Sequence, residues 1–160
     1  MLIRHSIDTD PEKLEKIARI VASGLAMEKI GQWSGSYPAL DDFMSDHENR
    51  SLLVADKDGV VIGSITIQPE NDPAYKELAW TGRNAYVVHR LMVLPEHRNK
   101  GVGKELFLSA IQKARDKGAG CVKVDTHPDN LRMQRLIESL EFARRGYMAS
   151  INRIGYELKL

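Results

Sequence analysis

The chain has 160 residues, of which 42% are hydrophobic and 28% charged, a mixture typical of one globular domain, 1–160, with one core. Its 23 basic and 22 acidic residues give a formal net charge of +1, so no overall field favours nucleic acid or a membrane surface as a partner. The single cysteine excludes an internal disulfide, and neither a leader-like start nor a run of 18 apolar residues is found. We therefore expect a cytoplasmic protein.

Hydrophobic periodicity and turn residues predict an α/β (α+β) chain. Asp10 followed by Pro11 is typical of a helix start, with Asp10 as the N-cap, and Asp58-Gly59 between two apolar runs predicts a hairpin. The predicted strands are 2–6, 51–55, 60–68, 85–94, 121–126, 142–147 and 154–158, and the predicted helices are 10–31, 40–46, 101–117 and 130–140. Because 85–126 forms one strand–helix–strand crossover, we expect a mixed sheet.

The most informative segment is 93–104, where a buried strand turns into a helix through a short loop with Gly101 and Gly103. The first N–H groups of a helix have no intrahelical partner, and the helix dipole adds partial positive charge there. Glycine lets the backbone approach a ligand closely, and Arg98, Lys100 and Lys104 add charge. The segment predicts a diphosphate site; the alternative is a basic helix start without a ligand.

Two other phosphate-binding motifs are excluded by this spacing. A Walker loop needs glycine at position 98 and a hydroxyl residue at position 105, where this chain has Arg98 and Glu105. A dinucleotide fingerprint needs a third glycine at position 106, where this chain has Leu106. The predicted diphosphate site is therefore of another kind.

The run Arg98-Asn99-Lys100-Gly101-Val102-Gly103 resembles the Arg/Gln-x-x-Gly-x-Gly/Ala hallmark of the GCN5-related N-acetyltransferase (GNAT) family. The preceding run 91–95 and the later runs 125–130 and 133–147 are also similar to family motifs, and the element order agrees over nearly the whole chain. The resemblance implies the GNAT fold, with a mixed sheet of about seven strands that splays between strands 4 and 5, and about four helices. It also implies acetyl-CoA as co-substrate and no metal.

The resemblance further implies the coenzyme contacts. Backbone amides of 99–104 would hold the pyrophosphate, the strand at 91–93 would pair with the pantetheine arm, and the N–H of Met92 or Val93 would polarise the thioester carbonyl. Asn130 would contact the arm or cap the next helix, two roles that are compatible. The implied coenzyme-binding residues are Leu91, Met92, Val93, Arg98, Asn99, Lys100, Gly101, Val102, Gly103, Lys104, Asn130 and Met133.

Catalytic groups are less well defined by the sequence. Many family members carry a tyrosine, seven residues after the asparagine, that protonates the leaving thiolate, but here that position is Ile137. Tyr147 is our substitute, with water or the outgoing ammonium proton as the alternative. His89, on the central strand where related enzymes often carry a glutamate, is our candidate base, against a packed structural histidine. His127 and Asp125 are second choices for the base.

The acceptor pocket is assigned to aromatic residues of irregular segments, Trp33, Tyr37 and Trp80. The alternative is that these side chains cover the edge of the core. Arg90 pairs either with an acidic group of the acceptor or with a structural carboxylate. Cys121 begins a buried strand and is expected to be a small core residue rather than a nucleophile.

The sequence as a whole therefore predicts an N-acetyltransferase that moves an acetyl group from acetyl-CoA directly to a primary amine of a small molecule. The alternatives are a protein N-terminal or lysine acetyltransferase of the same fold and a non-catalytic acyl-CoA-binding sensor. Related proteins often dimerise through sheet edges, so a homodimer is also open.

Overall fold

The computed structural model describes residues 1–160 and contains one mixed sheet of seven strands, in the order β1-β2-β3-β4-β5-β7-β6. Its strands are β1 (Leu2–His5), β2 (Leu52–Lys57), β3 (Val60–Pro69), β4 (Ala85–Val93), β5 (Cys121–Thr126), β6 (Ala143–Met148) and β7 (Arg153–Lys159). Its helices are α1 (Asp10–Met27), α2 (Leu40–Glu48), α3 (Val102–Asp116) and α4 (Leu131–Ser139), with the short 3₁₀ helices η1 (Pro73–Glu77) and η2 (Pro95–His97). The predicted fold and element order are confirmed.

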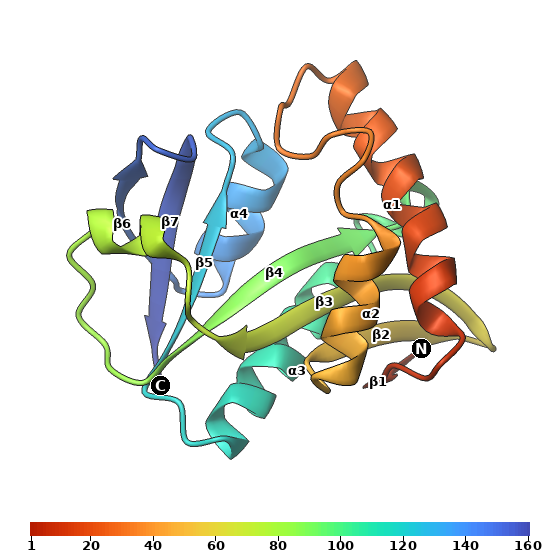
Figure 1. Cartoon of the computed structure of the whole chain (residues 1–160), viewed down its shortest axis with the longest axis horizontal. Coiled ribbons are helices and arrows are strands. Elements are labelled where there is room, and N and C mark those ends of the chain that lie inside the picture. Colours follow the sequence, from red (N-terminus) through yellow and green to blue (C-terminus); the bar gives the residue numbers. More distant parts are fainter.

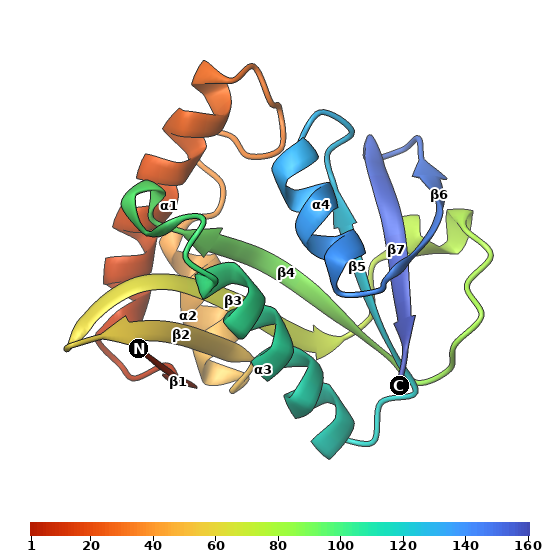
Figure 2. The same cartoon turned by 180° about the vertical axis from the view of Figure 1, so that it is seen from behind.

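The helices form a layer on each face of the sheet. Helices α1 and α2 cover one face and α3 and α4 the other (Figures 1 and 2). The apolar stripe of α3 joins the larger core cluster, and that of α1, including Leu14 and Val21, joins a second cluster on the opposite face. The two clusters hold α1 and α3 against the sheet, and with them the loop that follows α1 and the loop that precedes α3.

The central feature of the sheet is the divergence of β4 from β5. These parallel strands pair only from Ala85 with Cys121 to Val88 with Val124. Beyond Val88, β4 continues beside β3 while β5 continues beside β7, so the two strands spread apart (Figure 1). The edge of β4 that faces β5 is therefore free of a strand partner beyond Val88, and its backbone groups can pair with an extended ligand.

A β-bulge in β4 lies at the start of this divergence. Ser64 pairs with Met92 and Thr66 with His89, so β4 has one more residue than β3 between these pairs. Arg90 lies in the bulge with φ 52°, and its guanidinium donates to both carboxylate oxygens of Asp46, at 2.7 and 2.6 Å. The partner of Arg90 is thus a structural carboxylate of α2, which resolves the alternative left by the sequence.

The two ends of α1 differ from the prediction. The helix ends at Met27 rather than near Gly31, because Lys29 takes a left-handed conformation and the N–H of Ile30 donates to the Leu25 carbonyl at 2.8 Å, the bonding of a Schellman motif. Residues 28–31, predicted as the last turn of the helix, consequently belong to a loop that continues to residue 39.

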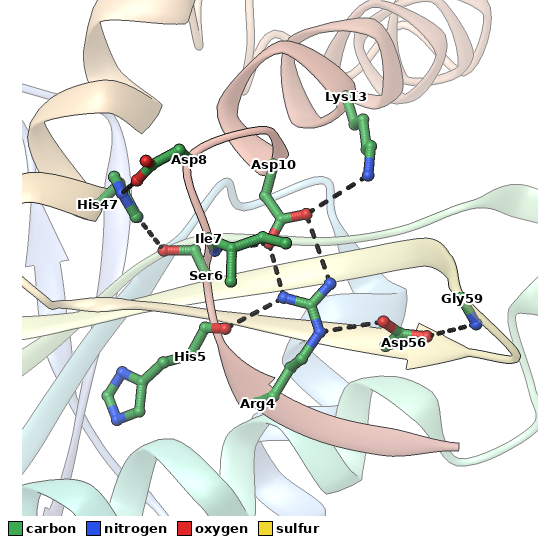
Figure 3. Close-up of polar contacts among 10 residues, drawn as sticks. All are labelled: Arg4, His5, Ser6, Ile7, Asp8, Asp10, Lys13, His47, Asp56 and Gly59. Atoms are coloured by element: carbon green, nitrogen blue, oxygen red, sulfur yellow. Dashed lines mark hydrogen bonds and ion pairs between the residues drawn. The ribbon is translucent and has the colours of Figure 1, made fainter.

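At the start of α1, the cap residue is Thr9 and not Asp10. The Asp10 carboxylate is fully buried and instead accepts from the Ile7 N–H at 2.8 Å and from Arg4 at 2.7 Å (Figure 3). Arg4 also donates to Asp56 at 3.0 Å, so one guanidinium joins β1, α1 and the β2–β3 hairpin. These contacts anchor the start of α1. Near the other end of the same helix, Val21 and Leu25 line a cavity of the candidate active site.

Candidate active site

The loop between β4 and α3 presents a row of unpaired backbone donors. Asn99 and Gly101 both have positive φ, 59° and 82°, which turns the chain tightly into α3. The first helical bond is from the Glu105 N–H to the Gly101 carbonyl, and the N–H groups of residues 99–104 donate to no acceptor in the protein. Six donors at the positive end of a helix dipole suit a diphosphate.

A cavity of about 240 Å³ lies against this loop. Gly103 lies at its edge, where a β-carbon would come within 3.2 Å of Leu136 Cδ2. Of the predicted coenzyme-binding residues, eleven line the cavity: Leu91, Met92, Val93, Arg98, Asn99, Gly101, Val102, Gly103, Lys104, Asn130 and Met133. Lys100 does not line it, because its ammonium group donates to the Glu96 carbonyl at 2.9 Å.

Three polar residues of this cavity were absent from the predicted set: Gln32, His97 and Arg132. Burial is the main cause of a lowered pKa of Arg98, and the positive charge of Arg132 is the next. Two guanidinium groups are therefore held close enough to repel each other, and an anion between them would relieve that repulsion. No sequence motif marks Arg132, because helix α4 brings it to the loop.

Asn130 both caps α4 and lines the cavity. Its Oδ1 accepts from the Met133 N–H at 3.2 Å, and its Nδ2 donates to Gln32 Oε1 at 2.9 Å. The same Gln32 oxygen accepts from Thr126 Oγ1 at 3.1 Å and from the His127 N–H at 3.2 Å. Gln32 thus fastens the loop 28–39 to the corner between β5 and α4, across the divergence of β4 and β5.

A second cavity, of about 440 Å³, continues from the first. Both are lined by Gln32, Trp33, Leu91 and Met133, so they meet beside β4 where it leaves β5. The other polar and aromatic residues of the second cavity are Tyr37, Asn71, Asp72, His89, Arg90, Phe107, Asp125 and Arg153. Two of the three predicted acceptor residues, Trp33 and Tyr37, lie here.

His89 is the first residue of β4 beyond the last pair with β5, and its side chain lines the second cavity. Burial lowers the pKa of His89 to about 4, with the charge of Arg90 as the next cause, against the opposite effects of Asp46 and Asp72. The imidazole is therefore neutral at pH 7. It can accept a hydrogen bond from a molecule in the cavity.

Asp125 lies on β5 across the opening from His89. The Tyr75 hydroxyl donates to its carboxylate at 2.6 Å, and Arg153 Nε lies 3.8 Å from the other oxygen. Burial raises the pKa of Asp125, while the Tyr75 hydrogen bond opposes the shift. These contacts hold η1 and β7 against β5, as well as placing a carboxylate in the cavity.

Two predicted site residues lie outside both cavities. Tyr147, on β6, is half exposed and donates to Asn152 Oδ1 at 2.7 Å. Trp80 stacks on Tyr75 at 5.2 Å between ring centroids, and its ring lies 4.5 Å from Lys123 Nζ. Trp80 is therefore packed against Tyr75 and Lys123 and does not line either cavity.

The comparisons with known proteins agree with this geometry. A model of the Acetyltransferase (GNAT) family matches residues 23–142, which are most of the chain. The chain belongs to this family. Human N-acetyltransferase 8B is 33% identical over 93 residues, which are 58% of this chain and 38% of the human protein. The matched region thus spans less than half of that relative's length.

Solved structures of the family share the fold over the whole chain. An acetyltransferase of the GNAT family from Streptococcus agalactiae has a TM-score of 0.83 at 18% identity, covering 99% of this chain and 95% of its own. The yncA protein of Salmonella typhimurium, solved with its cofactor acetyl-CoA, has a TM-score of 0.76 at 20% identity, covering 100% and 94%. These similarities show the fold.

Two kinds of feature are absent from the structure. No three His, Cys, Asp or Glu side chains gather closely enough to hold a metal ion. None of the helices combines the length and the apolar character needed to cross a membrane.

Proposed function

We propose that the chain transfers an acetyl group from acetyl-CoA directly to the primary amine of a small molecule. One observation carries the proposal: two cavities meet at the divergence of β4 and β5, one lined by unpaired loop amides and the other by His89. A donor and an acceptor bound in these cavities would meet beside Leu91. Holding two reactants together in this way supplies much of the catalysis.

The first cavity fits coenzyme A by its chemistry. The free amides of 99–104, with Arg98 and Lys104, suit the pyrophosphate, and the free edge of β4 suits the amide-bearing pantetheine arm. The coenzyme would supply the acetyl group as an activated thioester. The acetyl-CoA of the Salmonella relative, which shares this fold, supports the assignment.

His89 is the proposed base. Its pKa of about 4 lies far below that of an alkylammonium ion, so His89 acts on the neutral amine rather than on its protonated form. The neutral ring would accept a hydrogen bond from an amine bound in the second cavity. Once the nitrogen attacks, its proton becomes strongly acidic, and His89 takes it.

The source of a proton for the leaving thiolate is not a tyrosine of α4. Ile137 is fully buried in the larger core cluster, and Tyr147 lies outside both cavities. A thiolate is a good leaving group, so we propose that the proton taken from the amine by His89 is then passed on to the thiolate, which leaves His89 neutral again. A sensor that binds acyl-CoA without transfer is the second candidate, favoured by this lack of an acid.

The test is a thiol-release assay with acetyl-CoA and a panel of small amines, amino acids and peptides, with coenzyme affinity measured by calorimetry. We expect transfer to small amines. Lys104→Ala should weaken coenzyme binding, and the matched variant Lys100→Ala, whose side chain points away from the cavity, should change it less. Acetylation of peptides alone would favour the protein acetyltransferase, and coenzyme binding without any transfer would favour the sensor.

A further inference from the structure

The arginines of the second cavity are occupied by the protein itself. Arg90 donates to both oxygens of Asp46 and, through Nη1, to the Tyr37 hydroxyl at 3.1 Å. Arg153 donates to the carbonyls of residues 151, 152 and 32, at 3.1, 2.9 and 2.9 Å, and its Nε faces Asp125. Most of the N–H groups of the two guanidiniums are therefore already used, and Arg90 already holds a carboxylate in the bidentate manner. An acceptor with a carboxylate would have to compete with these contacts.

Asp72 is the opposite case, a charged cavity residue without an ionic partner. Its Oδ1 accepts from the Ala74 N–H at 2.9 Å at the start of η1, and no cation lies within ion-pair distance. The other carboxylate that lines this cavity, Asp125, faces Arg153, and Asp46, outside its lining, pairs with Arg90. Asp72 is half-buried, so its charge is partly removed from water.

The charge of Asp72 acts on His89 and Asp125, at the end of the cavity where the transfer is proposed to occur. It opposes the fall in the pKa of His89 and adds to the rise in the pKa of Asp125. The same cavity is also lined by the apolar and aromatic residues Leu91, Phe107 and Trp33. The cavity thus combines a neutral nitrogen base, an apolar wall and a free negative charge.

We propose that the acceptor is a short diamine-like molecule, one amine of which reacts beside His89 while the second, protonated amine pairs with Asp72. This inference rests on the proposed function and names its substrate class. The apolar wall packs the carbon chain, and the ion pair at Asp72 holds the far end. A carboxylate at that end would meet Asp72 with like charge and find no free arginine.

The experiment compares three acceptors of one length: 1,4-diaminobutane, butylamine and 4-aminobutyric acid. With the wild-type chain, kcat/KM for the diamine should exceed that for butylamine by about tenfold, which corresponds to about 1.4 kcal/mol of ion pairing. The acid should be the poorest of the three. Asp72→Asn keeps the oxygen that accepts from Ala74, so η1 stays capped, and should bring the diamine-to-butylamine ratio near one.

Asp129→Asn, which removes an exposed carboxylate outside the cavity, is the control and should leave that ratio unchanged. Calorimetry with the coenzyme A complex measures diamine binding without turnover. Tighter binding of diamine than of butylamine, lost in Asp72→Asn, supports the inference even if no amine is acetylated, in which case only the proposed function fails. Equal binding of the diamine to both proteins, or a preference for 4-aminobutyric acid, overturns the inference while leaving the transferase function standing.

Discussion

Replacement of His89 by glutamine tests the environment of the proposed base. The folded chain binds a proton at His89 only near pH 4, whereas the unfolded chain binds it near pH 6.5. Between these values the unfolded state binds more protons, so acid destabilises the wild-type chain through this residue. Glutamine is of similar size and does not titrate, so His89→Gln should remove that part of the acid sensitivity.

The size of the effect follows from the two pKa values. A fall of about 2.5 pH units, at about 1.4 kcal/mol per unit, corresponds to roughly 3 kcal/mol. The wild-type advantage over His89→Gln should therefore shrink by about this amount between pH 7 and pH 4, and most of the change should fall below pH 6.5. Full urea-unfolding curves at fixed pH values measure this difference, and groups common to both proteins cancel.

His5→Gln provides a comparison, because the pKa of His5 is also lowered by burial but this histidine lies nearer the surface. It should change the pH dependence less. Parallel stability curves for the wild-type chain and His89→Gln would refute the argument, since they would show that His89 titrates alike in both states. In the transfer assay the same variant keeps a hydrogen-bond acceptor but cannot take a proton, so kcat should fall about a hundredfold at saturating acetyl-CoA while coenzyme affinity holds.

Three further changes test the geometry around the two cavities. Gly103→Val places methyl groups against Leu136 and the loop amides, so calorimetry should show at least a tenfold loss of coenzyme A affinity, while thermal unfolding still shows a folded chain; unaltered affinity would contradict the diphosphate site. Gln32→Ala leaves three buried donors without their acceptor and should cost about 1–3 kcal/mol in urea unfolding, whereas Gln32→Glu keeps an acceptor oxygen and should cost less. Asp46→Ala leaves Arg90 buried and unpaired, a loss of about 3–5 kcal/mol, and adding Arg90→Leu should recover part of it; an equal or larger loss in the double variant would argue against the buried pair.

Much of the fold could be read from local patterns. Alternation along the strands and the helical spacing of Leu106, Phe107 and Ala110 each lie within one element, so the sequence alone determines them. The same holds for the loop between β4 and α3, because a glycine-bearing turn into a helix is a contiguous feature. Hence eleven of the twelve predicted coenzyme residues line the first cavity. The end of α1 was wrong by a turn, because lysine at position 29 takes a backbone conformation more often taken by glycine.

The acceptor side was decided by tertiary structure. Gln32 contacts Asn130, which is 98 residues away in the sequence, and Arg90 pairs with Asp46, which is 44 residues away. The direction of a side chain in an irregular segment cannot be predicted from periodicity. The sequence therefore assigned Trp33 and Trp80 alike to the acceptor pocket, although only Trp33 lines the cavities.

The charge state of the site has the same origin. The sequence shows that His89 precedes Arg90, but only the fold supplies the burial that lowers the pKa of His89 to about 4. It likewise leaves Asp72 without a cation while giving Asp125 one. A local pattern determines the backbone conformation of an element because the interactions that favour this conformation join residues that are close together in the sequence. Pairing and desolvation depend on which elements meet in space, and only the packed sheet and its loops determine that.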